Sequence, residues 1–130
     1  HLMYQNPDLT PDERNKVWLD LEHKYRPWID FDNLPFYGRG AGWQRQLHIY
    51  ECPFYYIDYC LSTMAALQFF LLSLHDQKDA WERYLRLVRR AGTASYTELC
   101  ETAGLQVPFR DGSIKAIAQQ MSQWIAEHQV

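Results

Sequence analysis

Residues 57–74 read IDYCLSTMAALQFFLLSL, and this stretch decides the fold class. Asp58, Ser62, Thr63, Gln68 and Ser73 interrupt it. It falls short of the roughly 20 continuous apolar residues that span a bilayer, so we expect no membrane partner. A helix that is apolar on most sides in a soluble protein normally lies at its centre. We therefore predict a long, buried central helix here.

Helix signals lie on both sides of this stretch. Thr10 with Glu13, and Ser95 with Glu98, have the spacing of a capping box, and Asp76 can cap a further helix. The last predicted helix starts near residue 111 and has an apolar stripe that consists of Ile114, Ile117, Met121, Trp124 and Ile125. No alternating strand pattern competes with these helices anywhere. We predict an all-α, multi-helix fold.

Length, charge and cysteine content limit the domain organisation and the binding partners that we expect. We interpret residues 1–130 as a single helical segment with a helical entry (1–26), a glycine-rich connection (27–52) and a helical bundle (53–130). The net charge of −3 gives no reason to expect nucleic acid. Three cysteines without a pairing pattern suit a reducing compartment, and we expect a cytoplasmic protein.

Residues 46–59, QLHIYECPFYYIDY, contain the candidate chemistry. If a helix begins at the proline of this run, Tyr56 and Tyr59 lie side by side on one face, and Tyr55 points about 100° away. His48, on the entering segment, can reach the same spot. Neutral hydrogen-bond donors of this kind suit a substrate carbonyl or a developing oxyanion. Aromatic residues at a helix start are also common core or interface anchors, and spacing alone leaves both interpretations open.

Two segments of the chain carry a family resemblance. Residues 43–48 (WQRQLH) running into 53–59 (PFYYIDY) resemble the C-terminal part of oligoendopeptidase F, in the thimet-oligopeptidase family of zinc endopeptidases. The resemblance continues through further short segments, namely AALQ at 65–68, YL at 84–85, GT at 92–93, AGL at 103–105 and PF at 108–109. It implies a C-terminal helical segment of a zincin-like oligopeptidase.

Members of that family bind zinc through an HExxH helix and a further glutamate, and this chain lacks the motif. None of its histidines is followed by glutamate, and no two lie three to five residues apart; they are His1, His23, His48, His75 and His128. The cysteines, Cys52, Cys60 and Cys100, form no CxxC pair. We expect no metal to bind this chain. The resemblance implies that this chain is a C-terminal piece of a longer peptidase. Its partner would be the missing N-terminal part of the same protein, which would hold the zinc ligands.

The resemblance also implies roles for individual residues. By position, it assigns oxyanion stabilisation to His48, Tyr56 and Tyr59, and which phenol meets the oxyanion stays open. Tyr55 is the reserve candidate and, with Arg45, a candidate for substrate binding; Arg45 either orients substrate or pairs with an acid. A phenol with a pKa near 10 stays protonated, and hence a donor, at neutral pH.

The glycine-rich run at 38–42 (GRGAG) allows three interpretations. It lacks the strand and the glycine-to-lysine spacing of a phosphate loop. It is a flexible connection, or a loop in which Gly40 contacts a peptide near the substrate channel.

Two functions remain as hypotheses. The first is a segment of a zinc-dependent oligoendopeptidase for short peptides, with no activity in this chain alone. The alternative is a free-standing helical module that binds a protein or peptide through its tyrosines, without catalysis.

Overall fold

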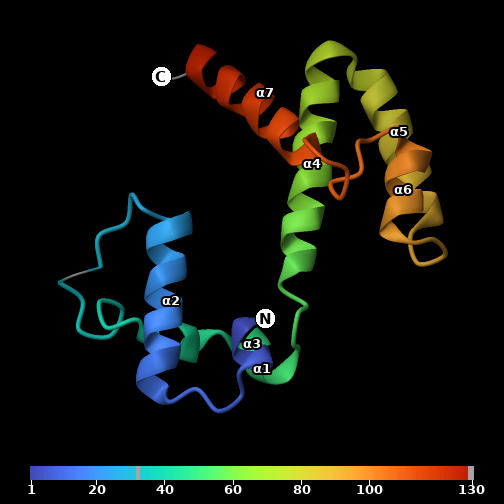
Figure 1. The fold of residues 1–130 in the computed structure, drawn as a ribbon. Helices are drawn as coiled ribbons and strands as arrows, with labels where there is room; N and C mark the ends of the chain where they lie inside the picture. The colour runs from blue at the N-terminus through green and yellow to red at the C-terminus, as the bar shows by residue number, and fades with distance from the viewer. Residues whose placement is uncertain (32, 129–130) are drawn as a thin grey trace. The chain divides into compact units, whose positions relative to one another are not determined.

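The computed structural model describes residues 1–31 and 33–128, and this part of the chain is helical without a strand (Figure 1). The elements are α1 (Leu2–Gln5), α2 (Pro11–Tyr25), the 3₁₀ helix η1 (Ala41–Arg45), α3 (Leu47–Glu51), α4 (Ile57–His75), α5 (Gln77–Arg90), α6 (Tyr96–Ala103) and α7 (Ser113–Glu127). The prediction of an all-α fold is confirmed.

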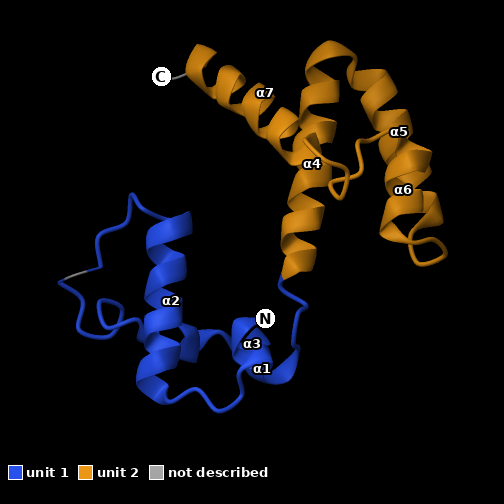
Figure 2. Ribbon diagram, viewed as in Figure 1, with its two compact units in different colours: residues 1–56 blue, residues 57–130 orange. Residues whose placement is uncertain are grey.

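The chain divides into two compact units, which Figure 2 shows in different colours. Unit 1 comprises residues 1–56 and unit 2 comprises residues 57–130. The three-part organisation expected from the sequence, within one segment of a larger domain, stays a prediction.

Unit 1 is built on α2, which begins as the sequence predicts. The Thr10 hydroxyl accepts a hydrogen bond from the Glu13 backbone N–H, and the Glu13 carboxylate accepts from the Thr10 backbone N–H at 2.8 Å. Pro11 occupies the first helical turn, where its missing N–H has no intrahelical partner to lose. Near the other end, the buried Glu22 carboxylate pairs with Arg26, whose Nε donates at 2.6 Å.

The segment that leads into η1 packs closely on α2. Gly40 has φ +78°, and a Cβ there would lie 2.1 Å from the Asn15 carbonyl oxygen. Trp43, 8% exposed, donates its Nε1–H to Asn15 Oδ1 at 2.8 Å. Glycine is required at position 40 because the close approach excludes a Cβ, and the left-handed backbone further favours glycine.

Unit 2 has a contiguous apolar core. Its buried residues are Cys100, Ala103, Leu105 and Val107, from α6 and the segment after it. The residues packed against them come mainly from α4 and α5 and are Ala65, Phe69, Leu72, Leu87 and Tyr96. Helix α4 contacts α5 and α7, and α5 contacts α6. Burial in this core raises the pKa of the Cys100 thiol.

Two long-range links hold α4 to the C-terminal half of unit 2. The Gln68 side chain accepts from the Gln106 backbone N–H at 2.7 Å and donates to the Gln106 carbonyl at 3.1 Å. The Tyr96 hydroxyl donates to the Leu61 carbonyl at 2.7 Å, and burial raises the pKa of this phenol. Because the buried Gln68 amide bonds to both the N–H and the carbonyl of Gln106, it fixes the position of α4 along its axis.

The expectation that α4 is buried is wrong for this chain. Gln68 is its only buried residue, and 6% of its most apolar stretch is buried. Helices α5, α6 and α7 cover part of its surface, and these few elements cannot surround an apolar helix. By length and composition alone, α4 could cross a membrane. This is weak evidence for a membrane span, because core helices of soluble proteins share these properties.

Helix α7 also differs from expectation. Ile117 of its apolar stripe is 1% exposed, whereas Ile114 and Ile125 are exposed by 53% and 49%. Trp124 packs edge-on against Phe70 of α4, with ring centroids 4.9 Å apart. One side of the stripe therefore meets α4, and the other side faces outward.

Candidate functional site

The candidate site residues of unit 1 lie on α3 and on the turn that follows it. His48 is in the first turn of α3, and the helix ends where the Cys52 N–H bonds to the His48 carbonyl. A turn follows, closed by a hydrogen bond of 3.2 Å from the Tyr55 N–H to the Cys52 carbonyl. Within it, Phe54 has φ +65°, a left-handed conformation that costs a non-glycine residue about 1–3 kcal/mol.

This turn overturns the predicted start of the helix at Pro53. Helix α4 begins at Ile57, so Tyr55 and Tyr56 precede it and share no helix face with Tyr59. The left-handed Phe54 is the physical reason, because a right-handed helix cannot continue through it. Proline is compatible with a first helical turn, but the next residue breaks that turn here.

The structure brings His48, Tyr55 and Tyr56 together, and we call these three residues the His48 cluster. The His48 ring stacks on Tyr55 with centroids 5.9 Å apart and an interplanar angle of 13°. Tyr56 meets the same imidazole edge-on at 4.7 Å and 75°. Both tyrosines are about half exposed. Tyr55 and Tyr56 thus contact the same imidazole, whereas a helix start at Pro53 would have directed their side chains about 100° apart.

Tyr59 belongs to unit 2, in the first turn of α4. Its side chain is 51% exposed. Its backbone carbonyl accepts hydrogen bonds from the hydroxyls of Ser62 and Thr63, at 3.1 and 2.7 Å. These bonds involve only the backbone of Tyr59, and its exposed phenol lies on the helix surface.

The predicted substrate-binding residues Arg45 and Gly40 have contacts of their own. The Arg45 guanidinium donates to the Tyr37 hydroxyl and lies over the Tyr37 ring at 5.7 Å. The guanidinium thus contacts a phenol. Gly40 is buried against Asn15 and Leu19, which supplies a packing reason for this glycine. Turns precede it and η1 follows, so the strand that a phosphate loop requires is absent from this part of the described chain.

Metal ligation does not fit the residues that the structure describes. In residues 1–31 and 33–128, no group of three or more His, Cys, Asp or Glu side chains is placed to hold a metal ion. The imidazole of the His48 cluster contacts the rings of two phenols. A zinc ion in the whole protein would need ligands from other residues.

Sequence reasoning missed Phe54. Its ring packs on Tyr4 at 5.1 Å and on His1 at 6.1 Å, and these contacts hold the strained turn that presents Tyr55 and Tyr56. The signal in the sequence was an aromatic residue directly after proline, in a run of rings too dense for one helix face. Backbone strain at such a position often marks a functional site.

The fold of this chain has counterparts in solved peptidase structures. A structure assigned to oligoendopeptidase F matches 99% of this chain at 41% identity, with a TM-score of 0.92. The structure of PZ peptidase A, solved with an inhibitor, also matches 99% of this chain at 41% identity, with a TM-score of 0.92. A structure assigned to oligoendopeptidase F from Bacillus anthracis matches 99% of the chain at 32% identity, with a TM-score of 0.74.

These matches define the chain as a helical segment of a peptidase fold. More particularly, it belongs to the oligoendopeptidase F family and corresponds to a C-terminal segment of that family. It covers 23% of the first two solved chains and 20% of the third. No protein-family model and no curated protein matches it at a significant level.

Proposed function

We propose that this chain forms part of a zinc-dependent oligoendopeptidase that hydrolyses short peptides in the cytoplasm. The observation that carries the proposal is the His48 cluster, in which one imidazole contacts two half-exposed phenols. The relatedness to peptidases over 99% of the chain supports it. The peptide substrate and the remaining part of the same polypeptide are the partners that this proposal names.

The cluster would stabilise charge during hydrolysis. A scissile carbonyl oxygen gains negative charge when its carbon is attacked, and a donor about 2.7–3.1 Å from that oxygen lowers the barrier. In this proposal Tyr56 and Tyr59 are the candidate phenol donors. His48 is a further donor, and it also orients Tyr56 through the edge-on contact of their rings.

Substrate binding falls to the neighbouring groups. Tyr55 stacks on His48 and is 47% exposed, so its ring can contact a peptide while its position is held. Arg45, anchored by Tyr37, supplies a positive charge for a carbonyl or a carboxylate. Gly40 would contribute backbone only, since its packing on α2 excludes a side chain.

Zinc would act through residues outside this chain. When bound, zinc would supply Lewis-acid chemistry at the scissile carbonyl. The residues described here bind and orient the peptide and donate hydrogen bonds to it. We accordingly expect the 130 residues alone to be inactive.

A second candidate function is a helical interaction module without catalysis. The observation in its favour is that Tyr55, Tyr56 and Tyr59 are all about half exposed, and exposed tyrosines are common anchors at interfaces. This module would bind peptide or protein with or without other parts of the polypeptide, and removing the phenol hydroxyls would change affinity instead of turnover.

The test uses the polypeptide encoded by the whole reading frame and a quenched fluorescent short peptide. We expect Tyr56→Phe or Tyr59→Phe to lower kcat by about 10²–10³, according to which phenol meets the oxyanion. Phenylalanine keeps the ring contacts and removes only the hydroxyl. Tyr50→Phe is the matched control, because Tyr50 is also exposed but its ring lies against Trp43, 6.2 Å away, outside the cluster.

Two outcomes would contradict the proposal. One is a whole polypeptide that hydrolyses no peptide in the presence of zinc. The other is an active polypeptide whose kcat is unchanged in both phenylalanine variants. Chelator-sensitive hydrolysis by the 130 residues alone would overturn the placement of the zinc ligands elsewhere.

A further inference from the structure

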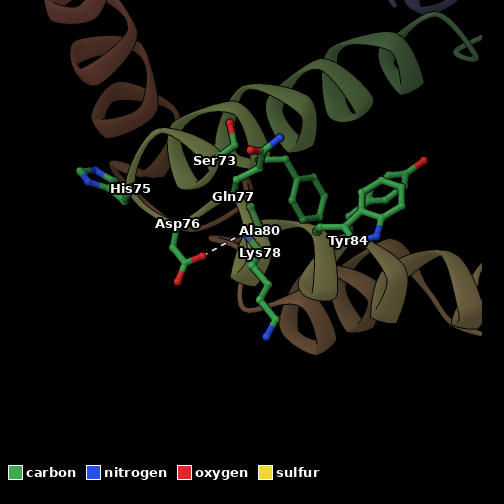
Figure 3. A pocket seen from close by; sticks show the side chains of 9 residues that line it. Ser73, His75, Asp76, Gln77, Lys78, Ala80 and Tyr84 are labelled. Atoms are coloured by element: carbon green, nitrogen blue, oxygen red, sulfur yellow. Dashed lines mark hydrogen bonds between the residues drawn. The ribbon is translucent and has the colours of Figure 1, made fainter.

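Helices α4 and α5 and the turn between them line an open groove of about 880 Å³ in unit 2, and Figure 3 shows the side chains that line it. Its lining includes Phe69 and Ser73 from α4, and Ala80, Trp81 and Tyr84 from α5. We call it the α4–α5 groove. It lies within one unit and shares no residue with the His48 cluster.

Aromatic rings form one wall of this groove. Trp81 stacks on Tyr84 with centroids 5.4 Å apart and an interplanar angle of 28°. Phe69 meets Tyr84 edge-on at 5.5 Å. Trp81 is nevertheless 58% exposed and Tyr84 41% exposed. These rings hold one another in place while much of their apolar surface faces outward.

The exposed surface continues along α5 as a regular seam. Trp81, Tyr84 and Val88 follow one another at spacings of three and four residues, and Val88 is 45% exposed. Ala80 is buried and Leu87 packs against the core that includes α6, so a different face of α5 already serves the core. A second apolar stripe at this spacing is the pattern by which one helix packs on another.

The relatives have further chain that could supply a cover for the seam. They match 99% of this chain, and the match takes up only 20–23% of their own length. We propose that the α4–α5 groove and the α5 seam seat an apolar helix from the part of an oligoendopeptidase F polypeptide outside this segment. The proposal rests on the proposed function, because that function places this chain within such a polypeptide. The low burial of the apolar helix α4 has the same explanation.

Contacts on α4 favour a protein occupant over a membrane. Gln68 is buried in the middle of the helix and bonds to both backbone groups of Gln106. Phe70 packs on Trp124 of α7. One side of α4 is thus a protein interface already, and the groove beside it lies between two helices, where a third helix can pack. Membrane insertion and pairing with a second copy of this chain become outcomes of the test.

The test compares two cysteine positions one residue apart. In a background with Cys52→Ser and Cys60→Ser, where Cys100 is fully buried, either Val88→Cys or Arg89→Cys is introduced. Val88 lies on the seam, and exposed Arg89 lies about 100° round the helix. Maleimide labelling rates are measured in the 130-residue chain and in the polypeptide of the whole reading frame, at equal concentration and without lipid.

We expect both positions to label quickly in the 130-residue chain. In the whole polypeptide the Val88→Cys position should label at least about tenfold more slowly, while the Arg89→Cys position changes less. Equal rates at position 88 in both proteins would overturn the proposal, as would a reading frame that encodes only these residues.

Two further results would also overturn it. One is protection of position 88 in the 130-residue chain that rises with its concentration, which indicates a second copy. The other is flotation of the whole polypeptide with phosphatidylcholine vesicles, accompanied by protection of position 88 only when they are present. Protection does not depend on turnover, so an inactive polypeptide that protects position 88 would contradict the proposed function alone.

Discussion

Unit 1 and unit 2 are stabilised in different ways. Unit 2 has a contiguous apolar core, and its helices α5 and α6 begin at side-chain caps. Unit 1 has one long helix, and its buried residues other than Glu22 cluster where the run from Gly40 to Trp43 approaches α2. The residues of the His48 cluster are in unit 1, on a short helix and a turn. The more regular unit thus provides packing, and the less regular one presents most of the candidate chemistry.

Each unit is therefore weakened by a different kind of substitution. A core of interdigitating side chains loses stability when volume is removed from it. A close approach between backbone segments loses stability when volume is added. The variants below use one kind of change on each unit.

The largest effect is expected at Gly40 in unit 1. Gly40→Ala should destabilise unit 1 by about 4 kcal/mol, because a Cβ would meet the Asn15 carbonyl oxygen at 2.1 Å while the backbone keeps φ +78°. Hydrogen exchange of the α2 amides measures the effect.

Gly92 provides the matched control in unit 2. It has the same φ of +78°, and a Cβ there meets nothing within 4 Å. Gly92→Ala should therefore cost only about 1 kcal/mol, from the left-handed backbone alone. Equal losses at the two positions would show that close packing on α2 contributes nothing.

The next effect concerns the core of unit 2. Ile117→Ala should lower the free energy of unfolding of unit 2 by about 3 kcal/mol, because the side chain is 1% exposed. Ile114→Ala, on the same helix and 53% exposed, should cost less than about 1 kcal/mol. Urea denaturation followed by circular dichroism measures both, and an Ile114 loss as large as that at Ile117 would contradict the described core.

The smallest effect is expected to be the same in both units. Thr10→Ala in unit 1 and Ser95→Ala in unit 2 each remove one capping box, at a cost of about 1 kcal/mol. Thermal unfolding of the two variants measures this. A loss in one unit only would show that its helix depends on packing and not on its cap.

The capping boxes also predict a pH dependence. The backbone hydrogen bond from Thr10 lowers the pKa of Glu13 below its usual 4.5, and the bonds to the Ser95 hydroxyl and backbone lower that of Glu98. A lowered carboxyl pKa stabilises the folded state above 4.5, and this stabilisation is lost as the pH falls through the lowered value. Glu13→Gln and Glu98→Gln should flatten the acid limb of a plot of stability against pH, and an unchanged limb would contradict this.

The helices were predictable from the sequence because their signals are local. The capping boxes at Thr10 and Ser95 and the cap at Asp76 all occur as their spacing predicts. The low burial of α4 was not predictable from its own residues. Burial depends on what surrounds a helix, and composition alone shows only that its surface is apolar.

The candidate site was predictable in its residues but not in its geometry. The proximity of His48 to Tyr56 was expected, whereas the stacking of Tyr55 on His48 depends on the backbone of Phe54. Proline before Phe54 is compatible with both a helix start and a turn. Contacts of Phe54 with Tyr4 and His1, about fifty residues away in the chain, accompany the turn, and no local pattern reveals them.

The Gln68 bridge has a consequence for the synthesis of the protein. Gln68 and its partner Gln106 are 38 residues apart, so α4 leaves the ribosome well before the segment that fixes its position. At about 5–20 residues added per second, the interval is roughly 2–8 s. Within this interval the 19-residue apolar helix α4 is completed before any of α6 or α7 has been made. Translation speed between codons 75 and 106 therefore sets how long chaperones and aggregation compete for this helix.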